Sequence, residues 1–180
     1  ELKAQDLSTI RDDSLDVVLC HWALTLMDPI APVLSEVRRV LSVGGKFAAL
    51  VDGPMNYAPG YSDVHDLIYS YVQDKLPSYG EFDLGDPRIR STNSLKNLAS
   101  EAFPDATIKV ETNVVSMQGP IAEVTKTAAG FFYASFMLPP EIHKTMLSKL
   151  SNLLSIKKKE EEFGNQGRFI MPISRIVINN

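Results

Sequence analysis

Several features are scarce or missing in this 180-residue sequence, and each absence narrows what the protein does. Cys20 is the single cysteine, so no disulfide can form within the chain, and a reducing cytoplasm is the expected setting. No apolar run is long enough to span a bilayer, the first residues lack signal-peptide character, and no cysteine or histidine pair has metal-ligand spacing. An excess of positive charge is also absent, because the net charge is −4. We therefore expect a small-molecule or protein partner rather than a nucleic acid or a membrane, and no metal.

What is present is ordinary for a globular protein. Hydrophobic residues make up 44% of the chain and charged residues 22%, and the length predicts one domain over residues 1–180. The beginning is unusual, because Glu1 to Leu7 lead almost directly into a strand of buried type. The sequence therefore looks like part of a longer chain.

The clearest pattern is a strand, a helix and a second strand between Asp16 and Asp52. Residues 16–20 and 46–52 are apolar on consecutive positions, which is typical of strands covered on both faces. Residues 30–41 have apolar side chains at helical spacing, with Asp28 as the expected cap and Gly44-Gly45 as the expected end. This order predicts two parallel strands joined by a right-handed crossover.

The other elements follow from periodicity and from turn residues. We expect a strand end at 2–7, a polar loop at 8–14, a turn-rich connection at 53–61, a helix from Ser62 and an irregular loop at 77–90. We then expect a helix near 95–103, a strand at 108–115, helices at 119–136 and from Pro139, a solvated helix end at 157–162 and a strand at 168–178.

Five segments follow a familiar order: Asp6-Leu7, Asp12 to Cys20, Asp28-Pro29, Glu36 to Leu41 and Gly44 to Phe47. Together they resemble the second half of a class I S-adenosylmethionine-dependent methyltransferase of the kind that acts on small molecules. The resemblance is specific over Asp6 to Asp52 and looser afterwards. It implies an α/β, Rossmann-like sheet that is mostly parallel, with an antiparallel last strand inserted beside the strand after Gly45.

One part of that family's pattern is missing. The glycine-rich cofactor loop and the acidic residue that holds the ribose precede the matched region, and this sequence has no glycine before Gly44. The resemblance therefore implies that the N-terminal strands are missing. The strand at 16–20 is then left with an open apolar edge, which we expect to pair with a second copy as a homodimer or with a missing N-terminal segment.

The resemblance also implies cofactor-binding residues. Asp6 would accept a hydrogen bond from the adenine amino group, and Leu7 would donate its backbone amide to the ring. Cys20 and His21 lie at the carboxyl end of a strand, where ligands bind in open α/β sheets. His21 is also a candidate general base, although a lone histidine is more often structural.

Candidate substrate-binding residues come from three segments. Trp22 follows the first strand, and segments 53–92 and 119–166 are expected to cover the acceptor site. Within the first of these, Tyr57, Tyr61, His65 and Tyr69 are candidates for a lid. A cluster of aromatic residues could line the acceptor pocket, but we favour core packing for it: Phe131, Phe132, Tyr133 and Phe136.

Three functions remain open at this point. The leading one is S-adenosylmethionine-dependent methyl transfer to a small-molecule acceptor in the intact enzyme, which needs positioning more than catalytic side chains. The missing glycine loop favours an alternative, a non-catalytic truncated module that acts in oligomerisation or interaction. A weaker third is a nicotinamide-dependent reductase, suggested by the four-residue spacing of Tyr71 and Lys75.

Overall fold

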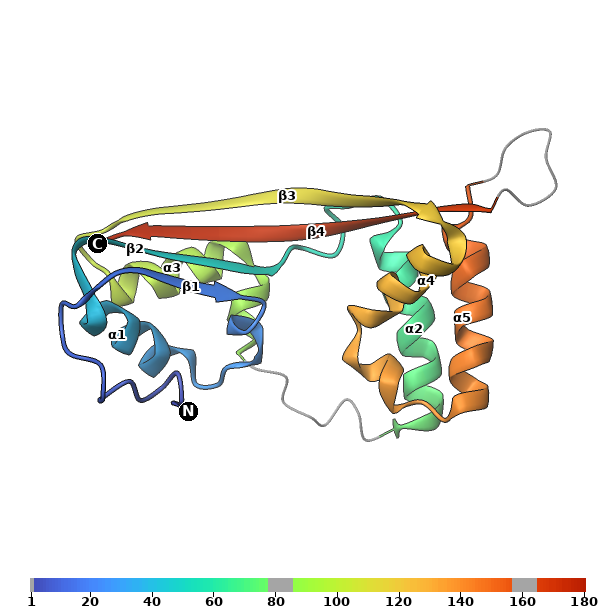
Figure 1. Ribbon diagram of the computed structural model, residues 1–180, viewed down its shortest axis with the longest axis horizontal. Helices are drawn as coiled ribbons and strands as arrows, with labels where there is room; N and C mark the ends of the chain where they lie inside the picture. Colours follow the sequence, from blue (N-terminus) through green and yellow to red (C-terminus); the bar gives the residue numbers. More distant parts are fainter. Residues whose placement is uncertain (1, 78–85, 157–164) are drawn as a thin grey trace. The chain divides into compact units, whose positions relative to one another are not determined.

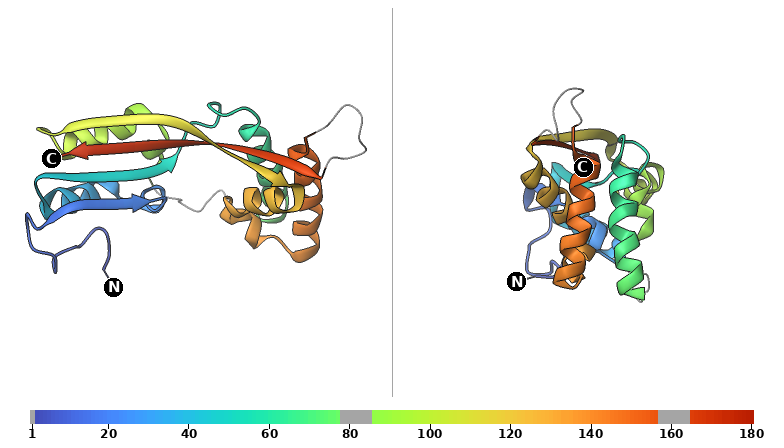
Figure 2. Two further views of the ribbon diagram at one scale, coloured as in Figure 1. Left: turned by 45° about the horizontal axis from the view of Figure 1, so that its top comes forward. Right: turned by 90° about the vertical axis from the view of Figure 1, so that its right-hand side faces the viewer.

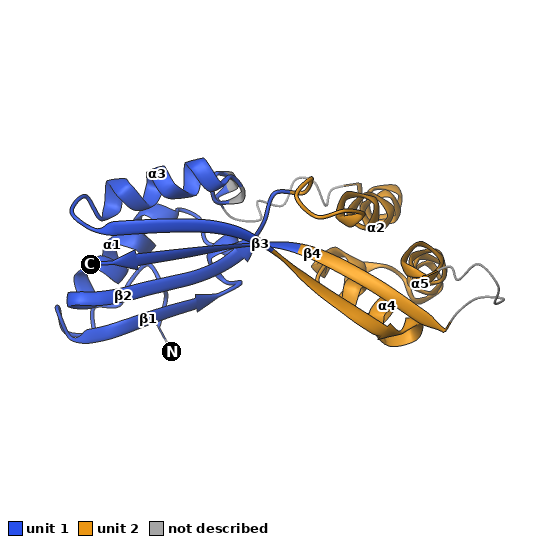
Figure 3. Cartoon of the chain, turned by 90° about the horizontal axis from the view of Figure 1, so that it is seen from above, with its two compact units in different colours: residues 1–54, 83–113, 172–180 blue, residues 55–82, 114–171 orange. Residues whose placement is uncertain are grey.

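The computed structural model describes residues 2–77, 86–156 and 165–180. The chain divides into two compact units, shown in different colours in Figure 3. Unit 1 comprises Glu1–Pro54, Asp83–Asn113 and Pro172–Asn180, and unit 2 comprises Met55–Phe82 and Val114–Met171. Because each unit is described by itself, the single domain over residues 1–180 stays a prediction. The predicted solvated helix end at 157–162 lies outside the described residues.

The sheet has four strands in the order β1-β2-β4-β3. They are β1 (Leu15–His21), β2 (Leu41–Asp52), β3 (Thr107–Pro120) and β4 (Gln166–Asn179). β1 and β2 are parallel, whereas β4 is antiparallel to β2 and lies between β2 and β3 (Figure 1). The expected insertion of an antiparallel last strand is therefore confirmed. β3 and β4 each contribute residues to both units.

Two helices cover one face of the sheet in unit 1. α1 (Ile30–Val40) and α3 (Thr92–Ala102) lie on the same side of the strands in Figure 1. Their apolar stripes meet the inward-facing side chains of the sheet, as the helical and alternating periodicities of the sequence require. Large side chains that are fully buried in this core include Phe47, Phe103, Leu34, Ile30, Leu95 and Ile176.

The prediction that β1 is covered on both faces is wrong for the described residues. Val18 and Cys20 pack against the core of unit 1, but Val17 and Leu19 on the opposite face are 55% and 75% exposed. In the described sheet β1 is also an edge strand. The apolar sequence of β1 is typical of a strand that is buried on both faces. In the described structure, α1 and α3 pack against one face alone.

The junction between α1 and β2 also differs from the prediction. Asp28 was expected to cap the helix, but the cap position is occupied by Pro29, one residue later. The helix start therefore has no hydrogen bond from a capping side chain. The helix ends at Val40 rather than at the glycines, and Leu41 already pairs with Leu15. The four following residues form a bulge before Val17 pairs with Lys46. Beyond the bulge, β1 and β2 run side by side (blue and cyan in Figure 2, left).

Gly44 and Gly45 lie in this bulge and do not end the helix. Gly44 has a φ of 78°, a conformation that favours glycine. A Cβ on Gly45 would lie 2.8 Å from the Ser42 carbonyl oxygen and 3.1 Å from that of Leu15. The bulge therefore requires both glycines, each for a different reason.

Unit 2 is built mainly from α2 (Tyr61–Lys75), α4 (Ile121–Gly130) and α5 (Pro140–Leu154). Their buried faces include Val64, Ile68, Val72, Val124, Ala128, Met146 and Leu150, at the helical spacings that the sequence indicates. Core packing of the aromatic cluster is confirmed for Phe132 alone. It is wrong for Phe131, Tyr133 and Phe136, which are exposed because the chain leaves α4 in a short 3₁₀ segment, Tyr133–Met137.

Candidate functional site

The carboxyl ends of the parallel strands β1 and β2 bring Trp22 and Asp52 together. Trp22 directly follows β1 and has a positive φ of 55°, which is unusual for a bulky residue. Its amide donates to the Leu50 carbonyl at 3.0 Å, and its indole Nε1 donates to Asp52 Oδ1 at 2.8 Å. The side chain of Trp22 is thus fixed at the edge of the sheet where ligands bind in open α/β folds.

Asp52 was not selected from the sequence as a site residue. It ends the second parallel strand, so the rule that parallel strands end at one sheet edge is the signal that could have found it. Its partner could not be read from the sequence, because the two residues are thirty positions apart.

Cys20 and His21 end β1 on opposite faces of the strand. Cys20 is half-buried on the covered face, and this burial raises the pKa of its thiol. His21 is exposed, and its ring meets the Trp22 ring edge to face at 5.0 Å. The Cys20 thiol is therefore neutral and weakly nucleophilic at neutral pH.

Asp6 lies in a tight turn, residues 3–8, which we call the Asp6 turn. Its amide donates to the Lys3 carbonyl at 2.9 Å, and its Oδ1 accepts the Ser8 amide at 3.1 Å. Hydrogen bonds from the side chain and the amide of Ser8 lower the pKa of the Asp6 carboxyl. The strand end predicted at residues 2–7 is thus replaced by a turn, because Asp6 bonds back to Lys3 rather than to the sheet.

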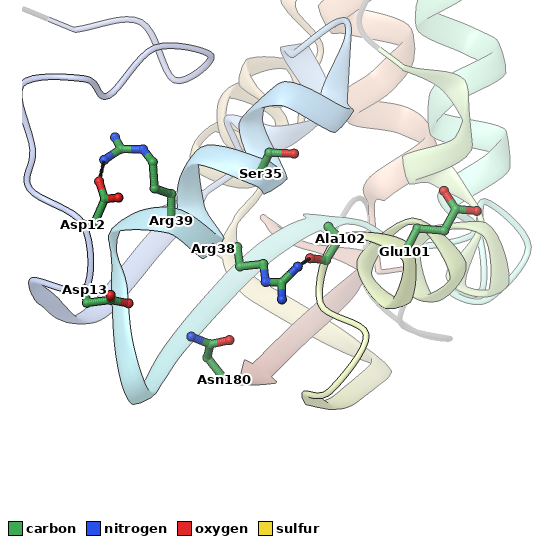
Figure 4. A pocket seen from close by; sticks show the side chains of 8 residues that line it. All are labelled: Asp12, Asp13, Ser35, Arg38, Arg39, Glu101, Ala102 and Asn180. Carbon is green, nitrogen blue, oxygen red and sulfur yellow. Dashed lines mark hydrogen bonds and ion pairs between the residues drawn. The ribbon is translucent and has the colours of Figure 1, made fainter.

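Leu7 donates its amide to a residue of α1. The acceptor is Glu36 Oε2, at 2.7 Å. The adenine contact implied for this amide stays a prediction, and it competes with Glu36 for the same hydrogen. Glu36 in turn pairs with Arg39, whose guanidinium also bonds to Asp12 (Figure 4).

A buried carboxylate, that of Asp86, supports the segment that follows β1. Asp86 accepts the amide of Arg88 at 3.0 Å, which caps the 3₁₀ helix Pro87–Arg90, and Arg88 Nη2 lies 2.6 Å from its Oδ2. This pairing lowers the pKa of Asp86. The Asp86 amide donates to the Met27 carbonyl at 3.2 Å, so the helix is tied to the chain just after Trp22.

A polar groove lies at the opposite, C-terminal end of α1. Its lining is shown in Figure 4 and consists of Asp12, Asp13, Ser35, Arg38, Arg39, Glu101, Ala102 and Asn180. Arg38 donates to the Ala102 carbonyl at 3.2 Å. Basic and acidic groups are mixed around it, and none of the residues predicted from the sequence as site residues lines it.

The predicted lid residues all belong to unit 2. Tyr61 is buried, with ring centroids 5.9 Å from Phe132 and 6.2 Å from Phe169. His65 stacks on Tyr69 at 4.3 Å, and Tyr57 is exposed. Because Trp22 belongs to unit 1, a pocket that combines it with these residues stays a prediction.

Comparison with known proteins shows which proteins this chain is similar to. A family model described as "Methyltransferase domain" matches residues 1–49, which include the Asp6 turn, β1 and α1. No curated protein matches the sequence. Among solved structures, the YcgJ protein of Bacillus subtilis covers the chain to 99%, with 14% identity, a TM-score of 0.56 and 69% of its own length matched.

Two further solved structures are similar to this chain over nearly all of its length. A putative methyltransferase of Bacillus halodurans C-125 matches 99% of this chain and 69% of its own, with 16% identity and a TM-score of 0.53. One from an antibiotic biosynthesis pathway of Anabaena variabilis matches 99% and 71%, with 14% identity and a TM-score of 0.54. The chain has a class I methyltransferase fold. Among the described helices of this methyltransferase-like chain, none combines the length and apolar character needed to cross a membrane.

Proposed function

We propose that this methyltransferase-like chain takes part in S-adenosylmethionine-dependent methyl transfer to a small-molecule acceptor. The observation that carries the proposal is the arrangement of the strand ends: Trp22 and Asp52 are joined where β1 and β2 end. The family match over residues 1–49 covers the Asp6 turn and the end of β1.

The Asp6 turn supports binding of the adenine end of the cofactor in this proposal. The Asp6 turn is at the surface of unit 1 with a carboxylate that stays ionised, since its pKa is lowered. Ala4 in this turn and Met27 beyond Trp22 both pack against the same hydrophobic core. The Asp6 turn and the segment after β1 therefore lie at the edge of one core. No glycine precedes Gly44, so the proposal assigns this chain no residue for the methionine end.

The cofactor, when bound, supplies a methyl group on a sulfonium that an oxygen, nitrogen or carbon nucleophile can attack. This chain's residues would bind and orient rather than react. Asp6 would accept the adenine amino hydrogen, Cys20 and His21 would line the cofactor, and Trp22 would close the side towards the acceptor. His21, exposed beside Trp22, is the candidate base for an acceptor proton. Tyr57, Tyr61 and His65 would contribute to the acceptor side from unit 2.

Calorimetric titration with S-adenosylhomocysteine tests this proposal. The wild-type chain should bind, and Asp6→Ala should lose about tenfold or more in affinity because a hydrogen bond to a charged group is removed. Asp13→Ala is the matched control, since it removes a carboxylate from the next loop. Equal affinities of the two variants would contradict the role of Asp6.

A second candidate function is favoured by the open edge of β1. Val17 and Leu19 are exposed on one face of this edge strand. If two copies paired antiparallel about Val18, Val17 of each would lie opposite Leu19 of the other, without opposing like charges. An unpaired apolar edge is a ready template for such pairing. The module would then act in self-association or interaction.

Light scattering decides whether this edge pairs. The chain should show the mass of a dimer, and Leu19→Lys should show that of a monomer because charge at an edge blocks strand pairing. Val43→Lys is the matched control, because Val43 is 94% exposed but lies in β2. A monomeric wild type at micromolar concentration would refute self-pairing.

Nicotinamide binding without S-adenosylhomocysteine binding would instead favour the third function, the nicotinamide-dependent reductase.

A further inference from the structure

The Asp6 turn is fastened to α1 by a single pair of side chains. Arg39 forms a bidentate ion pair with Glu36, in which Nε lies 2.8 Å from Oε1 and Nη2 lies 2.8 Å from Oε2. Glu36 Oε2 accepts the Leu7 amide, while Arg39 Nη2 donates to the Leu7 carbonyl at 2.8 Å. Both polar groups of the Leu7 backbone are therefore held by α1.

Arg39 extends this attachment along the loop that follows the turn. Its Nη1 donates to the Ile10 carbonyl at 2.9 Å and also to the Asp12 carboxylate. A guanidinium suits this task because its donors are fixed in one plane, whereas a lysine ammonium is a point charge on a flexible stem. A lysine at position 39 would keep the charge but could not hold all these acceptors.

The pair also determines which atoms of the turn face a ligand. The Leu7 amide is engaged by Glu36, and the Ser8 amide is engaged by Asp6 Oδ1. Among the described residues, Ser8 is the one hydrogen-bond partner of the Asp6 carboxylate. The group that the turn presents to a ligand is therefore a carboxylate oxygen, which accepts hydrogen bonds and repels other acceptors.

The charges of the pair act on Asp6 as well. The carboxylate of Glu36 opposes ionisation of Asp6, and the guanidinium of Arg39 favours it. Because Arg39 neutralises Glu36, the helix holds the turn without placing an uncompensated negative charge beside it. The Asp6 carboxylate stays an ionised acceptor at neutral pH.

We propose that Glu36 and Arg39 are positioning residues that hold the Asp6 carboxylate for the exocyclic amino group of a purine, and so set a preference for adenine over hypoxanthine. The inference rests on the proposed function, because it concerns the cofactor of that reaction. Hypoxanthine carries a carbonyl oxygen where adenine carries the amino group, so a fixed carboxylate would favour the first base and repel the second.

The test compares S-adenosylhomocysteine with S-inosylhomocysteine by calorimetry. Wild type should prefer the adenine compound by about tenfold or more. Arg39→Lys should lose most of that preference through weaker binding of the adenine compound, with little change for the inosine compound. Arg38→Lys, on the next residue and outside the contacts with the turn, should behave as wild type. An unchanged preference in Arg39→Lys, or an equal loss for both compounds, would overturn the inference.

Amide hydrogen exchange supplies a readout that needs no ligand. The Leu7 amide should exchange faster in Arg39→Lys than in Arg38→Lys. If Arg39→Lys does not fold, Glu36→Gln is a second variant in which the Leu7 amide should also exchange faster. If wild type bound neither compound, the proposed function would fail, and the exchange rates would still decide the attachment. Equal exchange of the Leu7 amide in the variants and the wild type would show that the pair does not hold the turn.

Discussion

The contact between Trp22 and Asp52 gives the sharpest test of the candidate site. Asp52→Ala removes the acceptor of the indole hydrogen bond, which is 2.8 Å long and partly buried. A hydrogen bond to a charged group contributes about 1.5–3 kcal/mol, and partial exposure places this one near the lower end. The backbone of Trp22 stays held by the hydrogen bond of its amide to the Leu50 carbonyl, so the loss is confined to the side-chain contact.

We therefore expect Asp52→Ala to lower the free energy of unfolding by about 1–2 kcal/mol and Tm by about 2–8 °C. Trp22 is the sole tryptophan, so its emission reports on this contact directly. The emission maximum should move to longer wavelength as the indole gains water. Asp52→Asn keeps an oxygen acceptor and should retain most of the wild-type Tm and emission. Wild-type emission and Tm in Asp52→Ala would refute the reasoning.

Three further predictions concern other parts of unit 1. In urea unfolding, Gly45→Ala should lower the free energy of unfolding by about 1–3 kcal/mol because the added Cβ meets backbone oxygens, and Gly44→Ala should lower it by about 1–2 kcal/mol because its φ is positive; wild-type stability of either variant would contradict the bulge. Iodoacetamide should label Cys20 more slowly than a free cysteine at pH 7, because burial raises its pKa; an equal rate would count against its placement. Pairing with Arg39 lowers the pKa of Glu36 to about 2, so its contribution to stability is present above the ordinary 4.5 and is lost as pH falls through about 2; Glu36→Gln should flatten acid unfolding in that range, and an unchanged slope would be evidence against the pair.

The crossover from β1 to β2 was predictable because its signals are local. Helical spacing placed α1 to within one residue, and the apolar runs on either side fixed two parallel strands. The resemblance supplied what periodicity could not, the antiparallel position of β4 between β2 and β3. Spacing along one strand carries no information on which distant strand lies beside it.

The misses have physical causes. Consecutive apolar residues in β1 indicate suitability for cover on both faces, but they do not say that the described chain supplies it. The glycines after α1 were assigned to a helix end because bulges and helix ends need the same residue.

The candidate site was only partly predictable for a related reason. Cys20, His21 and Trp22 followed from the rule on strand ends. The hydrogen bonds of Asp52 and Glu36 join residues 30 and 29 positions away, which the sequence pattern does not pair.

The most direct test of the central claim, that the strand ends of unit 1 bind an S-adenosyl cofactor, is the emission of Trp22 during titration with S-adenosylhomocysteine. Trp22 lies at the end of β1 and is the chain's sole tryptophan, so a ligand there must alter its surroundings. The account predicts a saturable change in emission that Asp6→Ala shifts to higher ligand concentration. Emission that stays constant up to millimolar ligand would contradict it.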